Sequence, residues 1–348
     1  MFEAFIIRAC GSDTAMIELC QEVCGATLLG RAIRMELIFA QGPAFTGKSV
    51  LIEILGDTLG DYATATKADI LLRSNRTGDG ERPSPFLVTL RGKRLVTCSE
   101  LPENTPLDDA LVKDLTGGDM ITARGLNKAP VTFRNTARII VRCNPLPVVT
   151  GSDDAIWHRL LIIPFKVVIP PEERDVDLRS KIATSELPGV LNWALEGLQR
   201  YVARGCKFSI PASVQAVVDK HRIESDVLGL WLDEHWKIEK TKTRPPYRAL
   251  QGSISTDYRE WCQLNGHHPV STKNLWAKLR ERCGYDPIKP LEGGRKYALG
   301  WRRKSLRSNV DEPSSITTPD TTFREVAEER RERKVVSIDA AKRRREQK

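Results

Sequence analysis

A glycine-rich segment with a lysine and a serine at fixed spacing begins at residue 42. It reads GPAFTGKS and fits the pattern G-x-x-x-x-G-K-S of phosphate-binding loops. In such a loop, backbone N–H groups surround the phosphates, the lysine adds its charge, and the serine hydroxyl ligates Mg²⁺. The pattern predicts ATP and Mg²⁺ as ligands. The predicted nucleotide-binding residues are Gly42, Pro43, Ala44, Phe45, Thr46, Gly47, Lys48 and Ser49.

The flanks of this segment decide between a phosphate site and an ordinary glycine turn. Residues 35 to 41 (MELIFAQ) form an apolar run of strand length. After Ser49, apolar residues recur at helical spacing up to Leu59, and Gly60 stands where a C-terminal cap belongs. A strand, a glycine loop and a helix are the context that a phosphate-binding loop requires, so the functional interpretation is favoured.

Three further polar residues follow or precede apolar runs of strand length. Glu100 follows RLVTCS and is expected to hold Mg²⁺ or orient a water; the alternative is that it only caps the next segment. Asn144 ends ARIIVRCN, where it can position a water beside the γ-phosphate. Arg159 is the first residue of RLLIIPF, directly before its apolar run, and could reach the γ-phosphate of a neighbouring subunit. Lys48, Glu100, Asn144 and Arg159 are the predicted catalytic residues.

Apolar runs alternate with helical stretches, which predicts an α/β fold with a mostly parallel sheet. A helical pattern follows in residues 176 to 236, where PGVLNWALEGLQRYV carries Val190, Leu191, Ala194, Leu198 and Tyr201 on one side. We predict an N-terminal helical segment (1–29), a P-loop ATPase core (30–170), a helical segment (171–240), a small basic domain (241–305) and a disordered charged tail (306–348).

The positive charge is concentrated near the C-terminus. Residues 241 to 305 contain 14 Lys/Arg and 5 Asp/Glu, whereas residues 1 to 240 contain 29 and 31. A helix at 257 to 266, a second at 272 to 283 capped by Ser271, and two extended runs around Gly293-Gly294 match a winged helix-turn-helix. The alternative is a solvated pair of charged helices. The predicted duplex-DNA contacts are Lys273, Lys278, Arg295 and Lys296.

Composition excludes several other classes of protein. No apolar run reaches the roughly 18 residues of a membrane helix, and MFEAFIIRACGSD lacks the basic start of a signal peptide. Eight cysteines without a C-x-x-C pair indicate buried thiols in a reducing cytoplasm rather than a metal site. A cytoplasmic protein without a membrane partner is expected.

Five segments in this order resemble the superfamily 3 helicase domain of phage and plasmid primase-helicases. They are GPAFTGKSVLIEILGDTLGDYA, RGKRLVTCSEL, LVKDLTGGDMITAR, VRCNPLPVV and AIWHRLLIIPF. The resemblance covers residues 30 to 205 and continues more weakly to 305. It implies an AAA+-like, ring-forming motor, usually hexameric, that hydrolyses ATP at subunit interfaces, translocates on single-stranded DNA and unwinds duplex during replication. The Gly117-Gly118-Asp119 turn also predicts a following hairpin with Asn127 and Lys128 at its tip. By this resemblance Arg159 is the arginine finger, and Lys113, Gly117, Gly118, Asp119 and Arg124 belong to the stretch that leads to a DNA-binding hairpin, where Lys128 contacts DNA.

The chain departs from the family's pattern at three places. A single acid, Glu100, follows Ser99 where many related ATPases have two acids, so its role toward metal, water or both stays open. His158-Arg159 stands where an arginine pair is common. Only 41 residues precede Gly42, too few for a primase domain, so a separate primase is an expected partner. The alternatives to a helicase are an initiator or loader that uses ATP as an assembly switch and, with less support, a small-molecule kinase.

Overall fold

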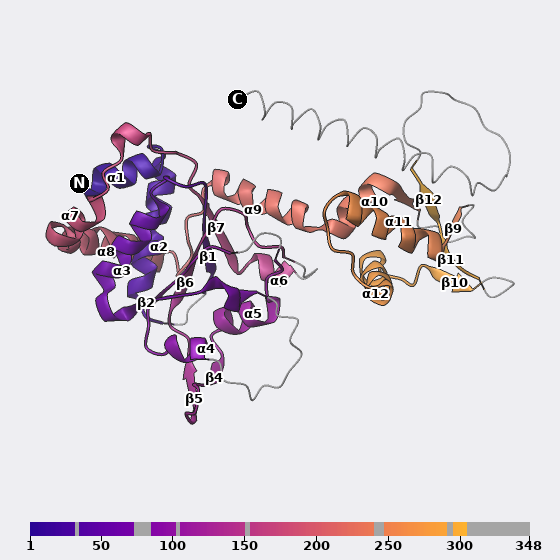
Figure 1. Ribbon diagram of the computed structural model, residues 1–348, viewed down its shortest axis with the longest axis horizontal. Coiled ribbons are helices and arrows are strands. Elements are labelled where there is room, and N and C mark those ends of the chain that lie inside the picture. The colour runs from indigo at the N-terminus through magenta and orange to yellow at the C-terminus, as the bar shows by residue number, and fades with distance from the viewer. Residues whose placement is uncertain are drawn as a thin grey trace, which may run out of the picture. The chain divides into compact units, whose positions relative to one another are not determined.

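The computed structural model describes residues 1–31, 35–72, 85–101, 105–149, 154–239, 247–290 and 295–304. Figure 1 shows these elements along the chain. The predicted turn at Gly293-Gly294 and the predicted disordered tail at 306–348 lie outside the described residues. None of the helices in the described part of the chain has the length and apolar composition to cross a membrane. All eight cysteines are free thiols, and all but Cys206 are buried.

The centre of the fold is a five-stranded sheet in which every neighbouring pair of strands is parallel. This confirms the predicted α/β core with a parallel sheet. Four strands fall within the predicted apolar runs. The fifth, β2, was not predicted because its sequence, ATAT, has little apolar character. The order across the sheet is β2 (Ala63–Thr66), β3 (Leu95–Cys98), β6 (Arg138–Cys143), β1 (Leu37–Gln41) and β7 (Leu160–Pro164).

Both faces of the sheet are buried under packed elements, and because side chains alternate along each strand, each strand contributes to two separate cores. Ile38 and Ala40 of β1 enter a core formed with α1 (Phe2–Ala9), α2 (Thr14–Leu28) and α3 (Lys48–Leu59). Leu37 and Phe39 enter a second core on the opposite face. That core includes α4 (Pro85–Thr89), α5 (Asp109–Gly117), α6 (Asp154–Trp157) and the hairpin β4 (Met120–Arg124) and β5 (Pro130–Arg134). Two single-turn helices, η1 (Gly60–Tyr62) and η2 (Ala68–Leu71), flank β2.

Helices follow the last strand, as the sequence predicts. They are η3 (Pro171–Glu173), α7 (Leu178–Ser185), α8 (Leu187–Ala203), α9 (Ala212–Ser225) and α10 (Val227–His235). The predicted apolar side of α8 is partly wrong, because Leu191 is exposed and Leu198 is only half-buried. α8 crosses α2 so closely that a Cβ at Gly197 would lie 2.1 Å from the Gln21 carbonyl oxygen. The contact is therefore centred on Gly197, and it turns Leu191 toward solvent.

The basic C-terminal part has a tryptophan-rich core of its own. Its elements are β8 (Trp236–Ile238), β9 (Arg248–Leu250), α11 (Gln251–Leu264), α12 (Thr272–Cys283), β10 (Ile288–Pro290), β11 (Lys296–Leu299) and β12 (Trp301–Arg303). α12 begins after Ser271, whose hydroxyl accepts the Asn274 N–H, as predicted. β10 and β11 pair antiparallel, and β9 adds a third strand. This core includes Trp231 of α10, so it extends N-terminally of residue 241.

Candidate nucleotide site and DNA-binding surfaces

The predicted phosphate loop connects β1 to α3, so the strand–loop–helix context is present. Gly47 caps α3 with φ +82°, a left-handed conformation that glycine adopts without strain. At Gly42, a Cβ would lie 2.1 Å from the Phe165 carbonyl oxygen, so only glycine allows the loop to pass β7. Lys48 is buried, and its Nζ donates to the carbonyl oxygens of Gly42 (2.8 Å) and Pro43 (2.7 Å). The lysine charge is thus directed into the loop.

Glu100 and Asn144 lie at the same edge of the sheet as the loop. They follow β3 and β6, which are neighbours in the sheet, and β6 also pairs with β1. Carboxyl ends of parallel strands meet at one edge, so three predicted site residues come together there. Burial raises the pKa of the Cys143 thiol to about 12, while the charge of Lys48 lowers it and that of Glu100 raises it. The charges of Lys48 and Glu100 therefore both act on the Cys143 thiol at the end of β6.

The residues at this edge are suited to Mg²⁺ with phosphate and water as its other ligands. Ser49 lies in the first turn of α3 and is half-buried, and its hydroxyl makes no hydrogen bond to any residue that the structure describes. Glu100 is exposed. In the described parts of the chain, no three His, Cys, Asp or Glu side chains gather as a metal cluster. Mg²⁺ at nucleotide sites keeps several waters and needs only one or two protein ligands, so Ser49 and Glu100 fit that ion.

Arg159 is at the opposite edge of the sheet. It immediately precedes β7, and its carbonyl oxygen accepts the N–H of Leu37, the first residue of β1. Its Nη1 donates to the Thr116 hydroxyl near the end of α5 (2.9 Å). The structure thus separates Arg159 from the loop, Glu100 and Asn144 of its own chain.

The predicted hairpin is present and is formed by β4 and β5, which pair antiparallel from Met120–Arg134 to Arg124–Pro130. It follows α5, which ends at Gly118 in a left-handed conformation. The side chains of Ile121 and Phe133 are buried in the core that also contains Leu37 and Phe39 of β1. Arg124 and Lys128 are exposed, and the hairpin extends away from the sheet (Figure 1). Both basic residues are therefore available to a ligand.

The basic residues of the C-terminal part differ in their surroundings. Arg280 and Arg282 of α12 form ion pairs with Asp286 and Asp226. These pairs partly neutralise the two arginines and so weaken their attraction for a negatively charged ligand. Lys273 at the start of α12 is exposed and Lys278 is half-buried, and Arg295 and Lys296 are exposed at the start of β11. The predicted contacts thus lie on two elements, the capped helix and the antiparallel pair of strands.

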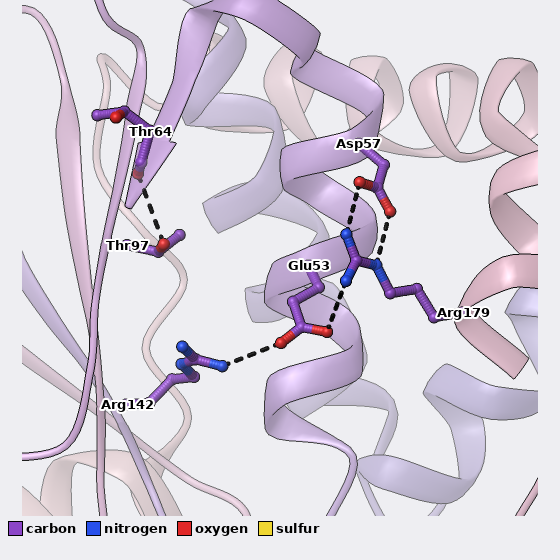
Figure 2. A network of polar contacts seen from close by, with 6 residues as sticks. All are labelled: Glu53, Asp57, Thr64, Thr97, Arg142 and Arg179. Atoms are coloured by element: carbon purple, nitrogen blue, oxygen red, sulfur yellow. Dashed lines mark hydrogen bonds and ion pairs between the residues drawn. The ribbon is translucent and has the colours of Figure 1, made fainter. Parts of the chain in front are cut away.

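Figure 2 shows a charged network beside the loop helix that the sequence did not reveal. Arg142 of β6 donates to Glu53 of α3 (3.1 Å), and Arg179 of α7 bridges Glu53 (3.2 Å) and Asp57 (2.8 Å). The bond to Asp57 is the first cause of the raised pKa of Arg179. The network joins the loop helix to β6, the strand that precedes Asn144. Its only sequence signal is the i, i+4 spacing of the two acids Glu53 and Asp57, a like-charge pair that destabilises an isolated helix.

Comparison with known proteins gives both a family match and named relatives. Residues 40–159 match a family described as a family of unknown function, DUF5906. The chain is 33% identical over 153 residues to "Putative helicase L207/L206" of Acanthamoeba polyphaga mimivirus, a match that covers 44% of this chain and 16% of that protein. It is 26% identical over 191 residues to "Putative helicase V13" of Sputnik virophage (51% and 24%). It is 30% identical over 154 residues to "Primase D5" of fowlpox virus (43% and 19%).

Among solved structures, the apo structure of the C-terminal region of NrS-1 matches with a TM-score of 0.47 and 14% identity, covering 85% of this chain and 74% of that chain. The matched part of the chain spans between 16% and 24% of the length of the three viral relatives. The chain is therefore similar to one portion of viral proteins that are named as helicases and primases, and the match to DUF5906 lies on the part that contains the loop, Glu100, Asn144 and Arg159.

Proposed function

We propose that this chain contains an ATP-driven DNA helicase motor that acts in replication. One observation carries the proposal: Lys48, Glu100 and Asn144 share one edge of the parallel sheet, while Arg159 lies at the other edge. A small-molecule kinase does not require this division between two edges. The names of the viral relatives support the same class of protein.

Each residue at the loop edge has a role in phosphoryl transfer to water. The loop N–H groups and Lys48 hold the phosphates, and Lys48 leaves the Gly42 and Pro43 carbonyls when phosphate competes for its charge. Ser49 and Glu100 would hold Mg²⁺, which neutralises charge on the phosphates when bound. Glu100 also accepts a proton from the attacking water, because it is an exposed acid in this set. Asn144 orients that water through its side-chain amide.

Arg159 completes the site of a neighbouring subunit in this proposal. An arginine finger stabilises the charge that develops on the transferred phosphoryl group. Repetition of the same loop-to-finger contact around an axis forms a closed ring, for which six subunits are the proposed number. Hydrolysis at each interface would then alter how adjacent subunits sit and so move the DNA.

Two surfaces are proposed to contact DNA. Arg124 and Lys128 on the β4–β5 hairpin contact the single strand inside the ring. The basic C-terminal part contacts duplex, with α12 as recognition helix and β10–β11 as wing of a winged-helix domain. Lys273 and Lys278 lie on the helix, and Arg295 and Lys296 lie on the wing. A separate primase is a further proposed partner.

The test measures ATP turnover and strand displacement with the same preparation. The expected result is hydrolysis that rises with single-stranded DNA, together with displacement of a labelled strand from a forked duplex. Lys48→Ala is the matched control, and it should lack both activities. Hydrolysis and DNA binding without displacement would favour the initiator or loader that uses ATP as a switch. Absence of DNA-stimulated hydrolysis in the wild-type chain would refute the motor.

A further inference from the structure

Phe45, the fourth residue of the phosphate loop, combines a strained backbone with an exposed aromatic ring. Its φ is +64°, in the left-handed region that bulky side chains rarely occupy. Its carbonyl oxygen accepts the N–H of Ile169 (2.8 Å), which holds this conformation in place. The residue remains 60% exposed. Strained residues that the surroundings hold in place occur most often at ligand sites, so Phe45 is a candidate ligand contact.

Arg174 lies over one face of this ring. Its Cζ is 3.7 Å from the ring centroid of Phe45, and its Nε donates to the Ile169 carbonyl oxygen (2.8 Å). The two terminal nitrogens of Arg174 have no hydrogen-bonding partner among the residues that the structure describes. Arg174 therefore presents two donor groups beside an aromatic ring at the edge of the phosphate loop.

Contacts with α1 fix the segment that carries Arg174. Arg8 near the end of α1 forms an ion pair with Glu173, the neighbour of Arg174 in sequence. A Cβ at Gly11, just after α1, would lie 2.9 Å from the Val167 side chain, so the chain is also in close contact there. The α1 end, the 165–174 segment and the phosphate loop thus converge. Because protein contacts hold Arg174, the pair with Phe45 exists before any ligand binds.

We propose that Phe45 and Arg174 hold the base and sugar of the nucleotide whose phosphates bind the loop. This inference rests on the proposed ATP site and adds the part of the nucleotide that the loop motif does not address. The loop N–H groups and Lys48 already serve the phosphates, whereas the aromatic ring and planar guanidinium provide flat surfaces for a base. The terminal nitrogens of Arg174 can donate to acceptors on the base edge or the sugar.

The test compares ATP with inorganic tripolyphosphate, which has the phosphates but no base or sugar. Binding of each ligand is measured by calorimetry for the full chain and for Arg174→Gln, Arg174→Lys and Phe45→Leu. We expect Arg174→Gln and Phe45→Leu to weaken ATP binding about ten-fold or more, since stacking on a side chain contributes that much to affinity. Tripolyphosphate binding should stay unchanged. Arg174→Lys should not restore ATP binding, because an ammonium group lacks the flat surface.

Two results would overturn this assignment. Equal weakening of ATP and tripolyphosphate, with recovery in Arg174→Lys, would make Arg174 a phosphate contact. Unchanged ATP affinity in both Arg174→Gln and Phe45→Leu would remove the pair from the site. Lys48→Ala is the control for the ATP site itself, because this variant should bind neither ATP nor tripolyphosphate. If the wild-type chain binds neither ligand, the proposed function fails and this inference fails with it. Thermal unfolding without ligand verifies that each variant is folded.

Discussion

Replacement of Arg159 by alanine should remove ATP hydrolysis by acting on the neighbouring subunit. Arg159 precedes β7, and its carbonyl oxygen accepts a hydrogen bond from the N–H of Leu37 at the start of β1. The phosphate loop, by contrast, follows the end of β1. β1 has five residues, and at about 3.3 Å per residue the two edges of the sheet lie roughly 15 Å apart. Arg159 therefore cannot act at the loop of its own chain. An arginine finger contributes about 10³ to 10⁵ in kcat, so Arg159→Ala alone should be nearly inactive.

Mixed rings make the prediction quantitative. In an equal mixture of Arg159→Ala and Lys48→Ala subunits, an interface is complete when its loop comes from the first variant and its finger from the second. With random mixing, each condition holds for half of the subunits, so about one quarter of the interfaces should be complete, whatever the ring size. The steady-state ATP hydrolysis rate of the mixture should therefore approach about one quarter of the wild-type rate, if interfaces act independently.

A second variant tests whether Arg159 has only a structural role within its own chain. Thr116→Val removes the hydroxyl that accepts from Arg159 but keeps the side-chain shape. Its hydrolysis rate should remain close to the wild-type rate. A mixture that never exceeds either single variant would refute the shared site. A loss in Thr116→Val as large as that in Arg159→Ala would indicate that the arginine acts by holding α5.

Three further predictions concern the loop and the basic C-terminal part. Lys48→Ala should abolish hydrolysis but change the free energy of unfolding by no more than about 3 kcal/mol, because two charge-assisted hydrogen bonds are lost together with a buried charge. Gly42→Ala should destabilise the chain by about 1–3 kcal/mol in urea unfolding and weaken ATP binding, because its Cβ would meet the Phe165 carbonyl oxygen. Lys273→Gln with Lys278→Gln should weaken duplex binding and reduce the slope of log K against log salt by about two.

Matched controls exist for these variants. Gly189→Ala places a Cβ where no heavy atom lies within 4 Å, so it should leave ATP binding unchanged. Lys220→Gln removes a highly exposed lysine of α9 and should leave the salt slope unchanged. Equal effects of Gly42→Ala and Gly189→Ala would contradict the role of close packing at the loop. An unaltered salt slope in the α12 variant would mean that duplex does not contact this helix.

Local sequence patterns were sufficient for the elements whose structure depends on neighbours in the chain. The loop, the strand before it and the helix after it follow from glycine spacing and apolar periodicity. α12 was predicted with its N-cap, because the Ser271 hydroxyl bonds to a backbone N–H only three residues away. The β4–β5 hairpin was likewise found at the predicted place. In each case the interactions that decide the structure span a few residues.

The tertiary structure decided which of these elements meet. The order of the strands brings Glu100 and Asn144 to the loop, because β3 neighbours β6 and β6 pairs with β1, and strand order depends on contacts between distant segments. Arg159 lies at the opposite edge because it precedes its strand and β7 runs parallel to β1. The exposure of Leu191 follows from the close approach of α8 to α2 at Gly197, which periodicity within α8 does not contain. The position of Arg174 over Phe45 likewise depends on the turn of the chain after β7. Sequence alone thus determined the chemical groups and their local elements, and long-range packing determined how they are combined.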